Sequence, residues 1–110
     1  MRSYLIDELS PRDVEKVNRY LTQKALASGL EKIFWVPVPN HLLSHIQSRH
    51  RTCQPFVYAL ELGGKWVKIE CFVRSLKGMI CECQDYPTPG QMTFILDFAH
   101  QMIKDLGIKT

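Results

Sequence analysis

The stretch FVYALELGGKWVKIECFVRSLKGMICEC (56–83) decides the fold of this chain. Apolar residues recur at about every second position, and a period of two places alternate side chains on opposite faces of a β-strand. Breaks that contain glycine fall at residues 63–64 and 77–78. We therefore predict a meander of three antiparallel strands over residues 56–62, 65–74 and 79–83.

The glycines at the two breaks predict the turns and hence the strand register. Gly63-Gly64 is typical of a two-residue hairpin turn in which both central residues have positive φ, and this turn pairs Leu60 with Val67. At the second break, a three-residue loop that ends at Gly78 keeps the apolar residues of the second and third strands on one face. That loop requires the left-handed conformation at its glycine.

Helices are predicted on both sides of the meander in the chain. The segment TPGQ (88–91) fits a capping box with proline at the first helical position. Apolar residues then recur at helical spacing up to Gly107, which is expected to end the helix as the glycine of a Schellman motif. A second helix is expected to begin at the dipeptide SP (10–11) and to run to about Ser28. Residues 3–6 are predicted as a short extended segment.

Two further elements are predicted between the first helix and the meander. The run LEKIFWVPV (30–38) predicts a strand, and its two prolines indicate an edge strand or an end at Val36. It could pair with either side of the meander. The segment NHLLSHIQSRHR (40–51) suggests a short helix capped by Asn40. The chain is thus predicted to be one α+β domain over residues 1–110. The expected architecture is an antiparallel sheet of about four strands (α-β-(α)-β-β-β-α) with the N- and C-terminal helices packed on one face.

Length and composition indicate an ordinary globular domain. The chain has 110 residues, of which 45% are hydrophobic and 23% charged, with a net charge of +3. This is enough for a single core. The apolar runs are too short to span a bilayer, and the first residues, MRSYLIDELS (1–10), carry acids where an export signal carries an apolar segment. We expect a soluble cytoplasmic protein that does not bind a membrane.

The four cysteines lack the CxxC spacing of a zinc ribbon or redox site. In the predicted meander, Cys71, Cys81 and Cys83 point into the core, and Cys71 lies opposite Cys83. Desolvation there disfavours the thiolate, and no inward histidine is identified to complete the roughly four ligands that zinc needs. We therefore expect no bound zinc and no other cofactor. The three inward thiols should react slowly, and Cys53 should react first.

The histidines and the wider sequence contain no catalytic motif. His41 and His45 would share a helix face, as metal-binding pairs do, with a third ligand from His50, Cys53 or a distant residue. Two exposed histidines explain the spacing equally well, and we favour this reading. A thiol–base pair of Cys53 and His50 is conceivable, but proximity in sequence does not establish geometry. No GxSxG motif or glycine-rich phosphate loop occurs, and we predict no catalytic residue.

The outer face of the predicted sheet is the strongest candidate for a binding surface. The two helices can cover only the other face, and large aromatic residues on an uncovered face suggest a partner. We expect a non-catalytic protein-interaction module that self-associates as a homodimer. The predicted partner-binding residues are Trp66, Lys68, Phe72, Arg74, Arg49 and Arg51.

Two other functions remain open. Aromatic residues interleaved with cations also suit a small-molecule or nucleic-acid binding module. Glu61, Glu70 and Glu82 share that face in the predicted register, however, and would repel a phosphate backbone. An enzyme of unknown type is the third possibility.

Overall fold

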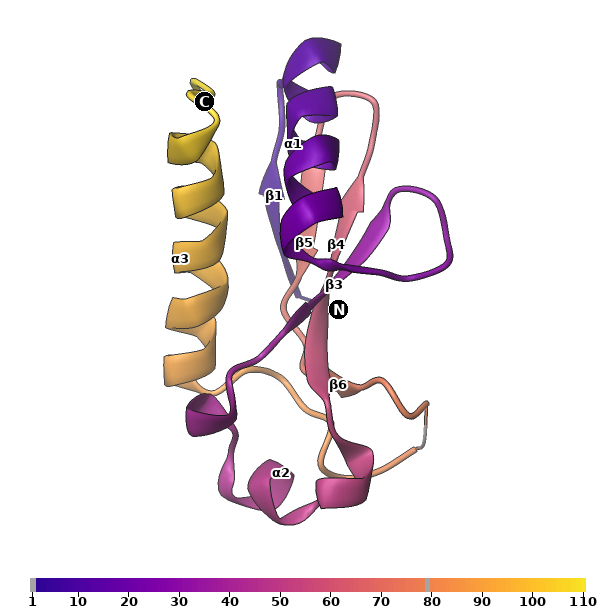
Figure 1. The fold of residues 1–110 in the computed structure, drawn as a ribbon. Coiled ribbons are helices and arrows are strands. Elements are labelled where there is room, and N and C mark those ends of the chain that lie inside the picture. The colour runs from indigo at the N-terminus through magenta and orange to yellow at the C-terminus, as the bar shows by residue number, and fades with distance from the viewer. Residues whose placement is uncertain (1, 79) are drawn as a thin grey trace.

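The computed structural model describes residues 2–78 and 80–110 (Figure 1). Two single-turn 3₁₀ helices, Asn40–Leu42 and Arg51–Cys53, flank the short helix α2. The strands and α-helices follow one another as β1 (Ser3–Ile6), α1 (Pro11–Lys24), β2 (Leu26–Ala27), β3 (Ile33–Pro37), α2 (His45–Arg49), β4 (Phe56–Leu62), β5 (Val67–Glu70), β6 (Arg74–Ser75) and α3 (Pro89–Asp105).

The strands form one antiparallel sheet in the order β1-β5-β4-β3-β2, and β6 pairs with β4 beyond the end of β5. The predicted α+β class with an antiparallel sheet is confirmed. The sheet has six strands instead of about four. Two short strands add to its edges, and the predicted middle strand is divided into β5 and β6, whereas residues 80–83 of the predicted third strand do not form one. β3 lies on the side of β4 opposite β5, which resolves the alternative that the sequence leaves open.

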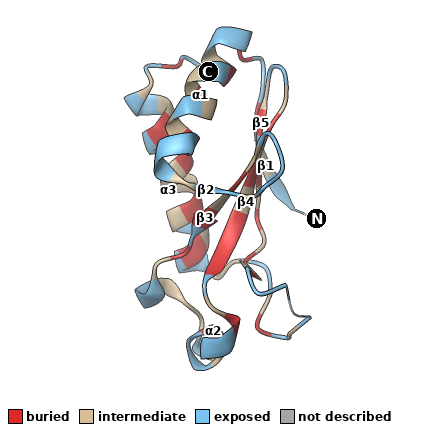
Figure 2. Ribbon diagram, turned by 45° about the vertical axis from the view of Figure 1, so that its right-hand side comes forward, coloured by how far each residue is buried: buried red, intermediate tan, exposed pale blue. Residues whose placement is uncertain are grey.

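Helices α1 and α3 pack on one face of the sheet, as predicted (Figure 2). Buried apolar residues line the inner stripes of both helices: Val14, Val17 and Leu21 on α1, and Ile95, Ala99 and Met102 on α3. The ring of Tyr58 on β4 meets the rings of Phe94 and Phe98 edge-on, with centroids 6.3 and 6.5 Å apart. The core therefore lies between the inner sheet face and these two helices. Within the described residues, no helix is long and apolar enough to cross a membrane.

The hairpin between β4 and β5 has a register two residues away from the predicted one. Leu60 pairs with Ile69 instead of Val67. The N–H of Gly63 donates to the carbonyl of Trp66 at 2.8 Å, so the turn is centred one residue later than predicted. Neither glycine of the pair is among the glycines with positive φ. A Cβ on Gly63 would lie 2.0 Å from the ring of Trp66, so the ring's close approach requires this glycine. A shift of two keeps every side chain on its predicted face.

The predicted third strand over residues 79–83 is wrong for the described residues 80–83, and residue 79 lies outside the described part. Gly78 has φ 69°, which confirms its left-handed conformation. Val73, however, exchanges backbone hydrogen bonds with Asp85 at 2.8 and 3.1 Å, and the described residues 76–78 and 80–84 form a loop instead of a strand. The N–H of Cys71 donates to the carbonyl of Arg2, which places Cys71 beside β1 and not opposite Cys83.

The ends of α3 are as predicted. Thr88 and Gln91 form the capping box. Gly107 has φ 65°, and the N–H groups of Gly107 and Ile108 donate to the carbonyls of Lys104 and Ile103, each at 3.1 Å. This is the hydrogen-bond pattern of a Schellman motif.

Two helix boundaries differ from the prediction. Helix α1 ends at Lys24 instead of about Ser28, because the next residues turn extended and pair with β3 as β2. The single helix predicted over residues 40–51 is interrupted. Ser44, not Asn40, caps α2 through a capping box with Gln47, and separate 3₁₀ turns precede and follow it.

Candidate metal centre and outer sheet face

Four potential metal ligands meet at the α2 end of the molecule: His50, Cys53, Cys81 and Cys83. Their ligand atoms all lie within 4.8 Å of one another. Nδ1 of His50 is 3.2 Å from Sγ of Cys81, within hydrogen-bond distance. We call these four residues the Cys₃His cluster. It joins the segment between α2 and β4 to the loop between β6 and α3.

Two tight turns bring the members of each pair together. His50 ends α2, and its carbonyl accepts the N–H of Cys53 at 3.0 Å. In such a 3₁₀ turn, residues three apart lie on the same side of the chain. In the second segment, the N–H of Gln84 donates to the carbonyl of Cys81 at 3.2 Å and closes a turn around Cys83. Each segment thus presents two donor groups to the same point.

Buried polar side chains hold the backbone around the cluster. Gln47, Ser75 and Gln91 are the buried polar residues in the described part of the chain. The amide of Gln47 donates to the carbonyl of Cys83 at 3.0 Å, and the hydroxyl of Ser75 donates to the carbonyl of Cys53. Gln91 on α3 donates in turn to the side chain of Gln47 at 2.8 Å. Because buried polar groups require partners, these bonds resist movement of both cysteine-bearing segments.

The thiols of the cluster have different protonation preferences. The pKa of Cys81 is lowered to about 7, first by a hydrogen bond from the backbone N–H of Cys83 and then by contacts with the Cys83, His50 and Cys53 side chains. Burial is the main cause that raises the pKa of Cys83 to about 12. Cys53 is only 3% exposed, whereas Cys81 is half-buried. The expectation that Cys53 reacts first is therefore corrected, because the turn at residues 51–53 buries it whereas Cys81 is more exposed.

The structure also corrects the reasoning behind the predicted absence of zinc. That expectation relied on an inward strand over residues 79–83 and on the lack of a nearby histidine. Cys81 and Cys83 instead lie in a loop, and His50 faces them. The structure places His50 Nδ1 within hydrogen-bond distance of Cys81 Sγ, whereas the thiol–base pair considered from the sequence was His50 with Cys53. His41 is outside the cluster of described residues.

A second candidate site is the sheet face that α1 and α3 leave uncovered. We define the outer sheet face by the residues that line a hollow of about 250 Å³, namely Ile33, Trp35, Ala59, Glu61, Lys68, Glu70 and Arg74. Two ion pairs cross it: Lys68 Nζ lies 3.3 Å from Glu61 Oε1, and Arg74 pairs with Glu70. The guanidinium of Arg74 is 5.9 Å from the ring centroid of Trp35.

Of the six predicted partner-binding residues, Lys68 and Arg74 lie on the outer sheet face. Trp66 lies beside it at the hairpin, with Lys68 Nζ 5.8 Å from its ring centroid. Phe72 packs edge-on against Tyr86, with centroids 5.5 Å apart, and the guanidinium of Arg74 lies 5.7 Å from its ring centroid.

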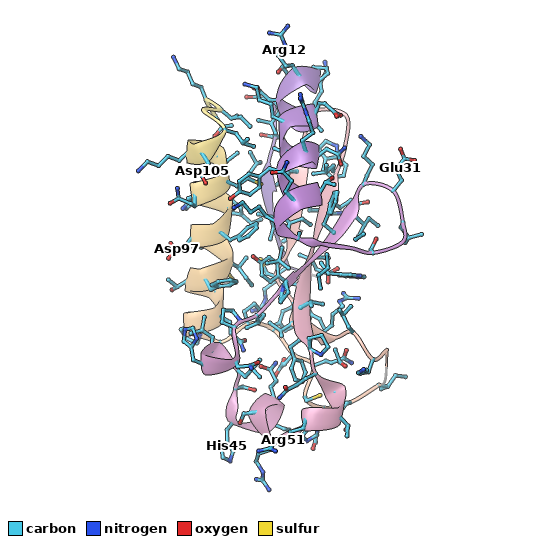
Figure 3. All side chains as sticks on the ribbon, viewed as in Figure 1. Arg12, Glu31, His45, Arg51, Asp97 and Asp105 are labelled. Atoms are coloured by element: carbon cyan, nitrogen blue, oxygen red, sulfur yellow. The ribbon has the colours of Figure 1, made fainter. Side chains whose placement is uncertain are left out.

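Arg49 and Arg51 lie apart from these residues, at the α2 end. Arg49 lines a separate hollow of about 460 Å³ with His45, Ile46, His50 and Glu82. Figure 3 shows Arg51 and His45 projecting from this end of the molecule. The structure therefore does not bring the predicted set together as one surface.

The sequence offered Trp35 or Phe34 from the strand over residues 30–38 as an aromatic residue of the uncovered face, but neither was among the six predicted partner-binding residues. The structure places Trp35 on the outer sheet face and buries Phe34, and the sequence prediction missed the cluster as a unit. Trp35 pairs with Ala59 across β3 and β4, and the position of β3 was open. The spacings HxxC (50–53) and CxC (81–83) were the available signal for the cluster. No protein-family model, curated protein or solved structure matches this chain.

Proposed function

We propose that this chain is a non-catalytic protein-interaction module that forms a homodimer through the outer sheet face. The observation that carries the proposal is the uncovered sheet face around Trp35. At the two sides of that face, Leu5 on β1 and Leu26 on β2 are 52% and 43% exposed. Both lie on the same side of the sheet as that face, because Leu5 pairs with Lys68 and Leu26 pairs with Trp35. Exposed apolar side chains on a sheet face that the chain leaves uncovered mark a surface for a partner.

The charges of this face favour a second copy of the chain as the partner. Two acids and two bases alternate as ion pairs, Glu61 with Lys68 and Glu70 with Arg74. In a two-fold symmetric interface the same patch meets itself, so it must be self-complementary. A patch that carries equal numbers of both signs satisfies this condition. It suits nucleic acid less, because the two glutamates offset the cations that would contact phosphates.

We also propose that the module works in the cytoplasm. The four cysteines are free, although three of them are close together. Such thiols persist in a reducing compartment, whereas an oxidising one favours disulfides.

Light scattering tests the homodimer. At high micromolar concentration we expect twice the chain mass of 12.8 kDa. Ala59→Arg places a long cation in the centre of the outer sheet face and should yield a monomer. Gln23→Arg adds the same charge at an exposed position on α1 and should remain a dimer, with circular dichroism confirming that both variants are folded. A wild-type monomer at this concentration, or a dimer that Ala59→Arg leaves intact, would contradict the proposal.

The alternative binding function predicts a different result. A nucleic-acid binding module would bind labelled single-stranded RNA or DNA at low salt and lose affinity steeply as salt rises. If the wild-type protein is a monomer that binds in this way, and Lys68→Ala weakens the binding, nucleic-acid binding would replace homodimer formation as the proposed function.

A further inference from the structure

We propose that His50, Cys53, Cys81 and Cys83 together bind one structural zinc ion. This inference is independent of the homodimer, because the Cys₃His cluster lies at the α2 end and includes no residue of the outer sheet face.

The donor set has the composition of a closed zinc site. Structural zinc is four-coordinate and tetrahedral, with cysteine sulfur and histidine nitrogen as ligands. Zinc–sulfur bonds of about 2.3 Å and zinc–nitrogen bonds of about 2.0 Å require neighbouring ligand atoms about 3.5–3.8 Å apart. All four ligand atoms lie within 4.8 Å of one another, and His50 Nδ1 is 3.2 Å from Cys81 Sγ. Small side-chain movements are enough to bring all four atoms to one ion.

Soft ligands also select the metal. Thiolate and imidazole suit zinc, whereas magnesium and calcium prefer oxygen ligands. With three protein thiolates and one imidazole, the coordination shell has no open position for water or substrate, so the ion would be structural and not catalytic.

Hydrogen bonds to the backbone of two ligand residues hold the ligands in position. The carbonyl of Cys53 accepts from Ser75, and the carbonyl of Cys83 accepts from Gln47, which Gln91 holds in place. Bonds of this kind orient metal ligands in established sites. Burial of three polar side chains at this end of the molecule costs desolvation free energy, and these hydrogen bonds offset that cost.

A bound ion would stabilise the loop between β6 and α3. Its backbone is tied to the sheet by the Val73–Asp85 bridge, and Ile80 at its tip is fully exposed. Leu76 is also exposed, so these two apolar residues of the loop do not pack into the core. A zinc ion would cross-link this loop to the turn at residues 50–53. In the sequence, the β4–β5 hairpin and β6 lie between these two segments.

Metal analysis tests the proposal on the full chain, purified without a polyhistidine tag under reducing conditions. We expect about one zinc ion per chain, and release of that ion when a mercurial reagent modifies the thiols. Cys83→Ser and Cys81→Ser should lower the zinc content and the zinc affinity at least about 10-fold. Cys71→Ser is the matched control, because Cys71 is also buried and free but lies outside the cluster. It should retain a full complement of zinc.

A cobalt titration of the metal-free wild-type chain keeps the test decisive if a serine variant fails to fold. Tetrahedral cobalt bound by thiolates has intense visible d–d bands and a sulfur-to-cobalt charge-transfer band, which zinc should abolish stoichiometrically. Four free thiols in the native protein, with neither zinc nor a tetrahedral cobalt spectrum, would overturn the proposal. Zinc retained in full by folded Cys81→Ser and Cys83→Ser variants would also overturn it, as would iron in place of zinc.

Discussion

At the scale of single residues, Tyr58 has an uncompensated polar group in the core. Its ring is fully buried against Phe94 and Phe98, and its hydroxyl has no hydrogen-bond partner among the described residues. Burial is the first cause that raises its pKa, followed by the charge of the nearby Cys71. The aromatic ring therefore contributes to stability through packing, while the hydroxyl opposes it.

Tyr58→Phe should leave the fold intact and raise the free energy of unfolding by about 1 kcal/mol, because it removes an unsatisfied buried hydroxyl. Tyr20→Phe is the matched control. The Tyr20 hydroxyl donates to Asp105 at 3.4 Å, so its loss should be neutral or slightly destabilising. Urea unfolding followed by circular dichroism measures both changes. A loss of more than about 1 kcal/mol in Tyr58→Phe would show that the hydroxyl has a partner, such as a bound water.

The same substitution should change the response to alkaline pH. Because the pKa of Tyr58 is raised in the folded state, ionisation of this residue costs the fold no stability below the unfolded-state pKa of about 10. As the pH rises above this value, the unfolded chain ionises first and the free energy of unfolding falls. The Tyr58→Phe variant should therefore lose less stability than the wild type above about pH 10.

At the scale of elements, local signals explain where the helices begin and end. Thr88 and Gln91 cap α3, Ser10 caps α1, and Ser44 caps α2 through the reciprocal bond with Gln47. Each of these caps joins residues three apart, so it depends little on the rest of the fold. The C-terminal end of α3 depends equally on one glycine with positive φ.

Gly107→Ala should lower the free energy of unfolding by about 1–2 kcal/mol, because an L-residue is strained in the left-handed conformation. A Cβ at this position would meet nothing within 4 Å, so the cost is one of backbone conformation alone. Gly64→Ala is the control, since a Cβ there also meets nothing but the residue is not among those with positive φ. Equal effects of the two substitutions in thermal unfolding would contradict the Schellman assignment.

At the scale of the whole molecule, the cysteines belong to two environments. Cys53, Cys81 and Cys83 meet at the α2 end, whereas Cys71 is buried between β1 and the core, with its N–H bonded to Arg2. Burial is the main cause that raises the pKa of Cys71. Its thiolate is therefore disfavoured, and a reagent can reach it only when surrounding structure opens.

We expect Cys71 to react slowly with an alkylating reagent once metal has been removed, and Cys81 to react first. Mass spectrometry of the labelled peptides identifies each site over time. The labelling rate of Cys71 should rise with urea in parallel with global unfolding, because its protection comes from its burial in the folded sheet beside β1. A fast rate at Cys71 that does not depend on urea would show instead that β1 detaches by itself.

The sequence by itself determined the features that depend on neighbours in the chain. Alternation with a period of two assigned the side chains of β4 and β5 to their faces, and the caps at Thr88 and Gly107 bounded α3. These features also determined the α+β class and the packing of two helices on one face. They are readable because strand and helix periodicities are set by local backbone geometry.

Only the tertiary structure decided which distant segments meet. A hairpin register shifted by two preserves both faces, so the apolar pattern could not distinguish Ile69 from Val67 as the partner of Leu60. Val73 bridges to Asp85, and the described residues 80–83 of the predicted third strand form a loop. That loop carries Cys81 and Cys83 to His50 and Cys53, about thirty residues away in sequence. The spacing of ligands in the sequence does not determine the distance between such segments in space. The packing of the strands between them determines where each segment lies.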